Sequence, residues 1–284
     1  MDVEAERLWL PKLPPIRIVL HRPIQGALRS ITVTRSPSGR YHASLLCEVD
    51  VPEPAPKAPA KESALDLGLT RFATTSDGQK VEAPQCLRQA ETKLARLQRR
   101  LARKKLGSHN REKARVQLAR LHEKIANQRA DFLHKLSWRL VRDNQALYVE
   151  SLNVHGLLAN HRIAKSISDA GWDEFLRQLQ YKGAWHACRV EAVDRFFPSS
   201  QLCHRCGFRH AGLKLAERAW DCPECHTRHD RDVNAARNLL AEGQTRAQQS
   251  IPRRAGMARR STPGETCARQ AGRGTRKLTA SAVE

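Results

Sequence analysis

Residues 63–69 read SALDLGL, an apolar run that a single carboxylate, Asp66, interrupts. The segment RFATT follows at 71–75 and leads into a turn-forming Ser-Asp-Gly, so the run is predicted to be a strand paired with a second strand. Two further strand-like segments lie downstream, ALYVE at 146–150 and RVEAVD at 189–194. Together these segments predict a buried sheet with an acid in its first strand.

Between residues 88 and 143 the apolar residues adopt helical spacing. They recur at Leu94, Leu97 and Leu101, then at Leu118, Leu121 and Ile125, then at Leu133, Leu136 and Leu140. The sequence GSHN at 107–110 interrupts the pattern, which predicts two long antiparallel helices. This segment carries 17 Lys and Arg against 5 Asp and Glu. A solvated helical face would also be charged, but the imbalance favours a surface that faces nucleic-acid phosphates.

The N-terminal part is predicted to be β-structure. Residues 16–22 and 27–34 are β-branched and alternating, and a turn at 36–39 precedes a strand that ends near residue 49. Residues 52–61, PEPAPKAPAK, are typical of a stiff linker and mark a domain boundary.

Toward the C-terminus, helices are predicted at 171–188 and at about 233–240. Beyond Gly243 the chain is rich in Arg, Gln, Gly, Ser and Thr, so residues 243–284 are predicted to be a disordered basic tail.

The overall charge points to a polyanionic partner. The 284 residues contain 50 Lys and Arg against 29 Asp and Glu, a net charge of +21. Nucleic acid is the leading partner and an anionic membrane surface is the alternative. No apolar stretch approaches the roughly 18 residues that a membrane span needs. The N-terminus has no signal-peptide pattern, so a cytoplasmic protein is expected.

Four of the eight cysteines form two tight pairs, CHRC at 203–206 and CPEC at 222–225. Each pair directs two thiolates from one turn, and two such turns complete a tetrahedral zinc site. Cys203, Cys206, Cys222 and Cys225 are therefore predicted to bind one structural zinc ion; a pair of redox motifs is the alternative. The nearby histidines at 204, 210, 226 and 229 are interpreted as surface or phosphate-contacting residues, and the other four cysteines as free thiols.

Three acids stand out in this basic chain: Asp66 in ALDLGL, Glu150 at the end of ALYVE, and Asp232 before VNAARNLL. A single acid at a strand end is usually a turn residue or an ion-pair partner. Three at strand or helix ends favour Mg²⁺ binding, because carboxylate oxygens are its preferred ligands. Two such ions can support phosphodiester hydrolysis.

Several segments together resemble the TnpB family, the transposon-encoded, RNA-guided endonucleases often labelled probable transposases. The resemblance spans about residues 8–242 and rests on LDLGLTRFATTSDG, LYVESLNVHGL, AKSISDAGWDEFLRQLQYK, VDRFFPSSQLCHRCG and HDRDVNAARNLL. It implies an α/β fold, a RuvC-like nuclease of RNase H type with a mixed sheet, a helical hairpin insertion and an inserted zinc ribbon. A partial β-barrel would precede this nuclease.

The resemblance also assigns roles. Asp66, Glu150 and Asp232 would bind catalytic Mg²⁺, with Asp232 preferred to Asp230, and Asn234 would support the site. DNA and a guide RNA would be the partners.

The implied organisation divides the chain at residue 62. A wedge-type β segment at 1–51 and the linker precede the nuclease core at 62–200, whose basic hairpin lies at 88–143. The zinc ribbon at 201–229 and the last nuclease segment at 230–242 follow. Compared with typical members the sequence starts inside the later part of the wedge-like barrel, which predicts an N-terminal truncation. The alternative function is therefore a catalytically weak or inactive nucleic-acid-binding remnant.

Overall fold

A computed structural model describes residues 2–4, 6–50, 54–55, 61–214, 216–250 and 276–280. The chain divides into two compact units, which we describe separately. The first comprises residues 1–53, 93–124 and 256–284, and the second comprises residues 54–92 and 125–255. Within the described ranges, no helix is long and apolar enough to cross a membrane.

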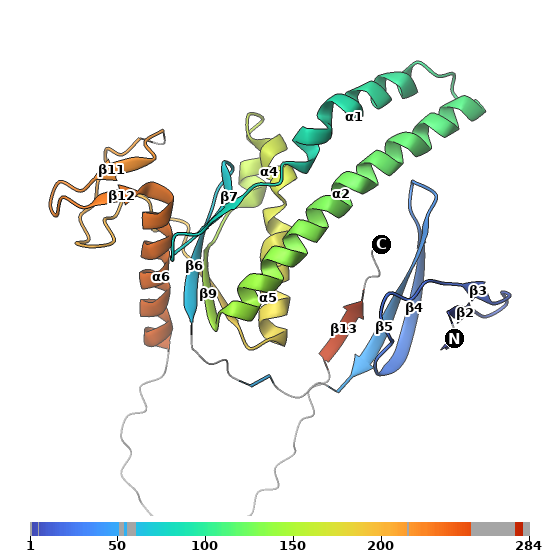
Figure 1. Cartoon of the computed structure of the whole chain (residues 1–284), viewed down its shortest axis with the longest axis horizontal. Coiled ribbons are helices and arrows are strands. Elements are labelled where there is room, and N and C mark those ends of the chain that lie inside the picture. The colour runs from blue at the N-terminus through green and yellow to red at the C-terminus, as the bar shows by residue number, and fades with distance from the viewer. Residues whose placement is uncertain are drawn as a thin grey trace, which may run out of the picture. The chain divides into compact units, whose positions relative to one another are not determined.

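The second unit is built on a mixed five-stranded sheet (Figure 1). Its strands are β6 (Glu62–Leu67), β7 (Arg71–Thr75), β8 (Lys80–Glu82), β9 (Ala146–Glu150) and β10 (Arg189–Val193), in the order β10-β9-β6-β7-β8. β6 pairs antiparallel with β7 but parallel with β9, which in turn pairs parallel with β10. The predicted strands at 63–69, 71–75, 146–150 and 189–194 are thus confirmed within one or two residues.

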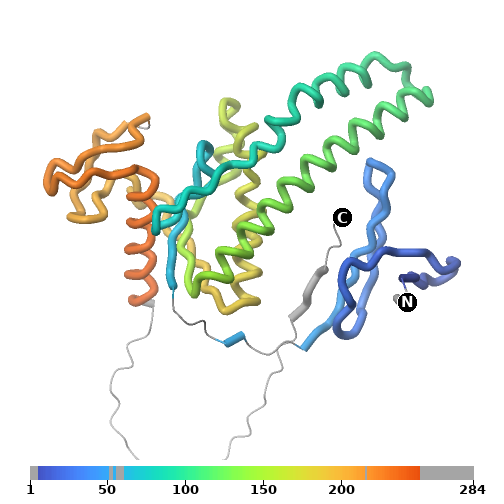
Figure 2. The backbone as a smooth tube through the Cα atoms, in the orientation of Figure 1, coloured from blue at the N-terminus to red at the C-terminus, as the bar shows by residue number. Residues whose placement is uncertain are grey.

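Strand alternation gives the two faces of this sheet different partners. On one face Leu65 and Leu147 join a core that includes Leu133 and Phe175. On the other, Ala64 and Tyr148 pack with Leu239. Figures 1 and 2 show the corresponding layers, with α6 (Arg231–Ser250) along one side of the sheet and α2 (His109–Asp143) and α5 (Trp172–Trp185) on the other.

The remaining helices are α1 (Cys86–Ala102), α3 (Val154–Leu158) and α4 (Ala164–Ala170). α1 and α2 form the predicted antiparallel hairpin, and the Arg111 guanidinium closes its turn by donating to the carbonyls of Leu101 and Lys104, at 3.1 Å each. Gly171, in the left-handed region at φ 69°, separates α4 from α5. The helix predicted at 171–188 thus begins one residue later, at Trp172, and it also ends earlier, at Trp185.

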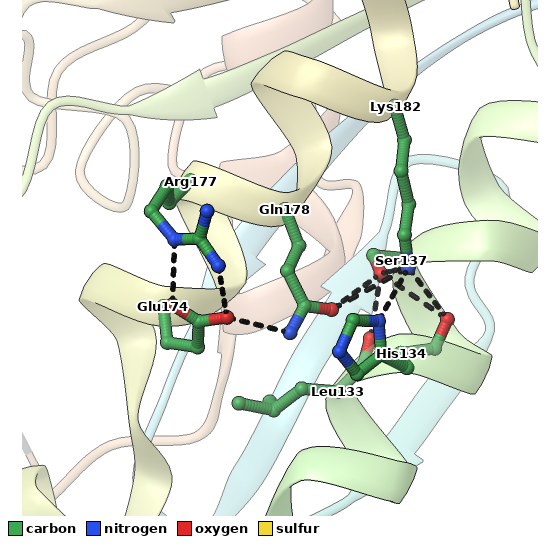
Figure 3. Close-up of polar contacts among 7 residues, drawn as sticks. All are labelled: Leu133, His134, Ser137, Glu174, Arg177, Gln178 and Lys182. Carbon is green, nitrogen blue, oxygen red and sulfur yellow. Dashed lines mark hydrogen bonds and ion pairs between the residues drawn. The ribbon is translucent and has the colours of Figure 1, made fainter. Parts of the chain in front are cut away.

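A buried polar network joins α2 to α5 (Figure 3). The Lys182 ammonium donates to the Ser137 hydroxyl at 2.7 Å and to the His134 carbonyl at 2.9 Å. The Ser137 hydroxyl in turn lies 3.0 Å from the Gln178 side-chain oxygen. Lys182 is only 7% exposed, and burial lowers its pKa to about 8, against the weaker opposing effect of Glu174. The two helices are thus held by directional bonds as well as by apolar contact.

The first unit contains two small sheets, β1-β2-β3 and β13-β5-β4. Their bounds are β1 (Asp2–Glu4), β2 (Arg7–Trp9), β3 (Ile16–Arg17), β4 (Ala27–Arg35), β5 (Tyr41–Val49) and β13 (Arg276–Ala280). The predicted hairpin is confirmed as β4 and β5. The strand predicted at 16–22 is wrong beyond Arg17, in a segment that has Pro23 after it and no ladder partner after β3.

The predicted disordered tail begins too early. α6 continues through Gly243 to Ser250, eight residues beyond the expected end of the last nuclease segment at residue 242. Gly243 is a packing residue and not a helix terminator, because a Cβ atom there would overlap with the ring of Tyr148. Residues 276–280 form β13, antiparallel to β5. The rest of the predicted tail, and most of the linker at 52–61, lie outside the described residues.

Candidate metal-binding ribbon and acidic edge

The four paired cysteines converge in a small ribbon between β10 and α6. Its two strands are β11 (Ala219–Asp221) and β12 (Arg228–Asp230). The Cys203 and Cys225 sulfurs are 3.6 Å apart, as are those of Cys206 and Cys222. A tetrahedron with Zn–S bonds of about 2.3 Å has edges of about 3.8 Å, so this spacing fits zinc closely. All four ligand atoms lie within 4.8 Å of one another.

Each cysteine pair lies in the same kind of turn. The Cys203 amide donates to the Phe208 carbonyl and the Cys222 amide to the Thr227 carbonyl. The residue after each pair, Gly207 or His226, has positive φ, at 78° and 54°. This conformation turns the chain tightly enough for both sulfurs to face one point. The ribbon's own small core contains Leu213 and Trp220.

His229 supports the cysteine cluster from outside it. Its Nε2 lies 3.1 Å from the Cys203 sulfur, and its ring packs between Trp220 and His204. A ring N–H donated to a thiolate stabilises the negative charge of that ligand. His204 contacts Asn234 and Arg237 instead. The prediction that the ribbon's histidines face solvent or phosphate is therefore wrong for His229, which is buried.

Two asparagines one turn apart on α6 attach the ribbon to the sheet domain. The Asn234 side chain donates to the Leu202 carbonyl at 2.6 Å and accepts from the His204 amide at 3.0 Å. Asn238 donates to the carbonyls of Ser199 and Leu202 at 2.7 Å each. Both ends of the Asn234 amide thus bond to the first cysteine turn, and the support that Asn234 would give to the acids stays a prediction.

The three predicted acids come from two strands that end at one edge of the sheet and from a helix that begins there. Asp66 is in β6, Glu150 is the last residue of β9 and Asp232 is in the first turn of α6. Strand alternation places Asp66 with Ala64, and Glu150 with Tyr148, on the face that α6 covers. The sequence alone gives no distances between the three acids. It does predict a shared location for Asp66 and Glu150, because the carboxyl ends of parallel strands lie at the same edge of a sheet.

Electrostatics couples the three carboxylates. The pKa of Asp66 is raised to about 8 by burial, and further by the negative charges of Asp232 and Glu150; Arg231 and Arg218 oppose the shift. Burial also raises the pKa of Glu150. An acid cluster with raised pKa values binds a divalent cation favourably, because the cation relieves the mutual repulsion.

Asp230 and Asp232 have different surroundings. Asp230 forms an ion pair with Lys80 at 2.5 Å and accepts a hydrogen bond from the Val233 amide at 3.1 Å, so it caps the start of α6. Burial would raise its pKa, but these contacts outweigh that effect and lower it. Asp232 is the member of the pair that acts on Asp66. The preference for Asp232 is thus consistent with the contacts of both residues.

Sequence reasoning missed Arg218. It lies just before β11 in the ribbon, yet its guanidinium is 3.4 Å from an Asp232 oxygen and lowers the pKa of Asp66. Because Arg218 and Asp232 are 14 positions apart in the sequence, no local pattern could reveal the contact. The docked ribbon therefore adds a cation to the acidic edge.

The cysteine site and the carboxylate site differ in how closely their ligand atoms cluster. In the part of the chain that the structure describes, the cysteine set is the one group of at least three His, Cys, Asp or Glu ligands close enough to hold one ion. The three carboxylates lie farther apart. An open set of oxygen ligands fits Mg²⁺, which binds through few protein groups and keeps several waters.

The structure defines an α/β protein with a ribbon whose four cysteines could hold a metal ion, beside an acidic sheet edge. Residues 44–161 match the family model described as "Probable transposase" (OrfB_IS605), and residues 172–239 match "Cas12f1-like, TNB domain". Two family models thus match separate parts of the chain, and the resemblance to the TnpB family that the motifs predicted is confirmed.

Two curated relatives are named RNA-guided DNA endonucleases. "Putative RNA-guided DNA endonuclease" of Streptomyces pristinaespiralis is 47% identical over 81% of this chain and 57% of the relative. "Putative RNA-guided DNA endonuclease InsQ" of Escherichia coli K12 is 34% identical over 86% of this chain and 63% of the relative. This chain thus spans about 60% of the length of either relative. A solved Cas12f1–sgRNA–target DNA complex matches 74% of this chain and 55% of that chain, with 16% identity and a TM-score of 0.46.

Proposed function

We propose that this protein is a Mg²⁺-dependent DNA endonuclease with a RuvC-like, RNase H type fold, acting in the cytoplasm. The observation that carries the proposal is the convergence of Asp66, Glu150 and Asp232 on one face and edge of the mixed sheet, where they share charge. The family and the names of the two relatives support it. The strand order, with two parallel pairs beside an antiparallel hairpin, supports the fold assignment.

The three carboxylates would bind the metal through their oxygens, with Asp66 between the other two. Mg²⁺ bound there supplies a Lewis acid that activates water and stabilises the leaving oxygen of a phosphodiester. Arg218, which contacts Asp232, provides a positive charge beside the substrate's phosphate. We expect hydrolysis without strand joining.

The cysteine ribbon has a structural role in this proposal. Its four sulfurs hold one zinc ion in a closed site, which leaves no position for substrate. Through Asn234 and Asn238 the ribbon is fixed to the helix that carries Asp232. Zinc thus supports the acidic edge through packing.

The nucleic-acid partners follow from charge and from the relatives. The net charge of +21, concentrated in the α1–α2 hairpin, favours phosphate binding. The relatives' names extend this to a guide RNA, which would select the DNA by base pairing.

A cleavage assay on labelled single-stranded and duplex DNA tests the proposal. It compares wild type, Asp232→Asn and Asp230→Asn with Mg²⁺, with and without RNA that copurifies with the protein. Both substitutions are isosteric and remove one charge in the same turn. Asp232→Asn should lose cutting by at least about a hundredfold, whereas Asp230→Asn should retain it because asparagine also caps helices well.

Two outcomes would contradict the proposal. Equal loss of cutting in both variants would mean that cutting depends on the negative charge of this turn, and not on Asp232 as a metal ligand. Absence of metal-dependent cutting under every condition, with tight and salt-sensitive binding retained, would leave the second candidate, a nucleic-acid-binding protein without catalysis. The excess of basic residues favours that candidate over any unrelated function.

A further inference from the structure

Phe196 is the feature that the proposed function leaves unexplained. It is one of six phenylalanines in the chain and is 78% exposed. The next residue, Phe197, packs against the core formed by Ala64, Tyr148 and neighbours. One ring of the pair therefore anchors the loop, while the other stands in solvent at a cost in apolar hydration.

The loop holds Phe196 outward by hydrogen bonds. The Asp194 side chain accepts from the Phe196 amide at 2.7 Å, and the Asp194 carbonyl accepts from the Phe197 amide at 3.1 Å. The Phe197 carbonyl accepts from the Ser199 amide at 2.8 Å. These successive bonds fix the backbone on both sides of Phe196, so its exposure is a property of the turn.

Arg195 covers one side of the exposed ring. Its guanidinium carbon lies 4.8 Å from the Phe196 ring centroid. A planar cation stacked on an aromatic ring offers an apolar π-face next to a phosphate-binding group. This combination suits a nucleotide, whose base stacks and whose phosphate carries the opposite charge.

The pair lies at the acidic edge of the sheet. β9 and β10 end in register, with Glu150 opposite Val193, and the Ser151 amide donates to the Val193 carbonyl at 2.8 Å. Phe196 follows Val193 by three residues, so its Cα lies no more than about 10 Å from that of Val193. Successive nucleotides of a stacked strand are about 3.4 Å apart, which places the ring within a few nucleotides of Glu150.

We propose that Phe196 and Arg195 form a stacking platform for an unpaired base of the DNA strand beside the cleavage site. This inference rests on the proposed function, because the acids define where the strand runs. The platform holds the strand in an extended path across the edge, so that its phosphate faces Asp66 and Glu150. The occupant is a nucleobase because the ring is paired with a cation in a chain of net charge +21.

Binding of single-stranded oligonucleotides that carry 2-aminopurine at successive positions tests this. All proteins carry Asp66→Asn so that the DNA stays intact, and Phe196 is changed to Ala, Leu or Tyr. Since Phe196 is exposed, each variant should fold. Stacking on an aromatic ring should quench the probe, and Phe196→Ala should lose this quenching and at least about fivefold in affinity. Phe196→Tyr should retain both properties, and Phe196→Leu should resemble the alanine variant.

Tyr41→Ala is the matched control, because Tyr41 is 69% exposed and also pairs with an arginine, Arg35, at 5.7 Å. It lies in the other compact unit, which contains none of the three acids, and should leave the quenching pattern unchanged. Unchanged quenching in Phe196→Ala, or full retention of quenching in Phe196→Leu, would overturn the platform. So would a Phe196→Ala variant that keeps its affinity for DNA but loses self-association of the protein.

The two proposals fail separately. If wild type cuts DNA and Phe196→Ala shows normal quenching, the platform is wrong and the nuclease stands. If wild type never cuts but quenching depends on an aromatic ring at residue 196, the nuclease is wrong and the base contact stands.

Discussion

At the scale of single residues, Asp66 is a proposed metal ligand whose negative charge lowers the stability of the metal-free protein. Its pKa is raised from the ordinary value of 3.8 to about 8, because desolvation and the charges of Asp232 and Glu150 disfavour the ionised form. The folded state therefore binds a proton that the unfolded chain releases above about pH 4. Stability of the metal-free protein falls as the pH rises from about 4 to 8.

Asp66→Asn should remove this cost. We expect the metal-free variant to melt a few degrees above wild type at pH 7.5, with a smaller gap at pH 5. Differential scanning fluorimetry at both pH values, with and without Mg²⁺, measures the effect. A variant that is less stable than wild type at pH 7.5 without metal would show that the acid is not strained.

At the scale of elements, Gly243 decides how closely α6 approaches the sheet. Alanine normally stabilises a helix interior relative to glycine by about 1 kcal/mol. Here the added Cβ would overlap with the buried ring of Tyr148, so Gly243→Ala should instead destabilise by about 1–3 kcal/mol. Urea unfolding measures the change. Gln248→Ala, at an exposed position of the same helix, is the control and should be close to neutral; a stabilised Gly243→Ala would contradict the packing.

The α2–α5 network gives a second prediction at this scale. Burial lowers the pKa of Lys182 to about 8 from 10.5, so the folded state releases a proton that the unfolded chain keeps between these values. Wild-type stability should therefore rise, relative to Lys182→Met, as the pH increases from 8 to 10.5. Thermal melts of both proteins across this range measure the difference. A gap that stays constant would mean that Lys182 is solvated in the folded protein.

The strands and the cysteine pairs were predictable because their signals are local. ALYVE and CHRC identify a strand and a metal turn without any other part of the chain. The packing role of Gly243 was not recognised because its partner, Tyr148, is distant in sequence. Arg218 was missed for the same reason. Its contact with Asp232 depends on the register of β11 and β12, in which the Arg231 amide donates to the Arg218 carbonyl.

At the scale of the whole molecule, zinc should stabilise the first turns of α6 as well as the ribbon that holds it. Zinc loss frees the cysteine turns, and with them the carbonyl of Leu202 that Asn234 and Asn238 bind. Chelation should therefore increase hydrogen exchange at residues 201–229 and in the first turns of α6. Metal analysis should find one zinc per wild-type chain, much less in Cys225→Ser, and an unchanged amount in Cys47→Ser. Protection of α6 that survives chelation would contradict the coupling.

The strand order β10-β9-β6-β7-β8 has a consequence for synthesis on the ribosome. β6 can pair with β7 as soon as both emerge, but its other edge waits for β9, and the face bearing Asp66 waits for α6. Chains fold from the N-terminal side as they are made, and pairings between distant segments come late. A damaged message or an early stop anywhere before residue 232 thus releases a polypeptide that lacks at least one of the three acids.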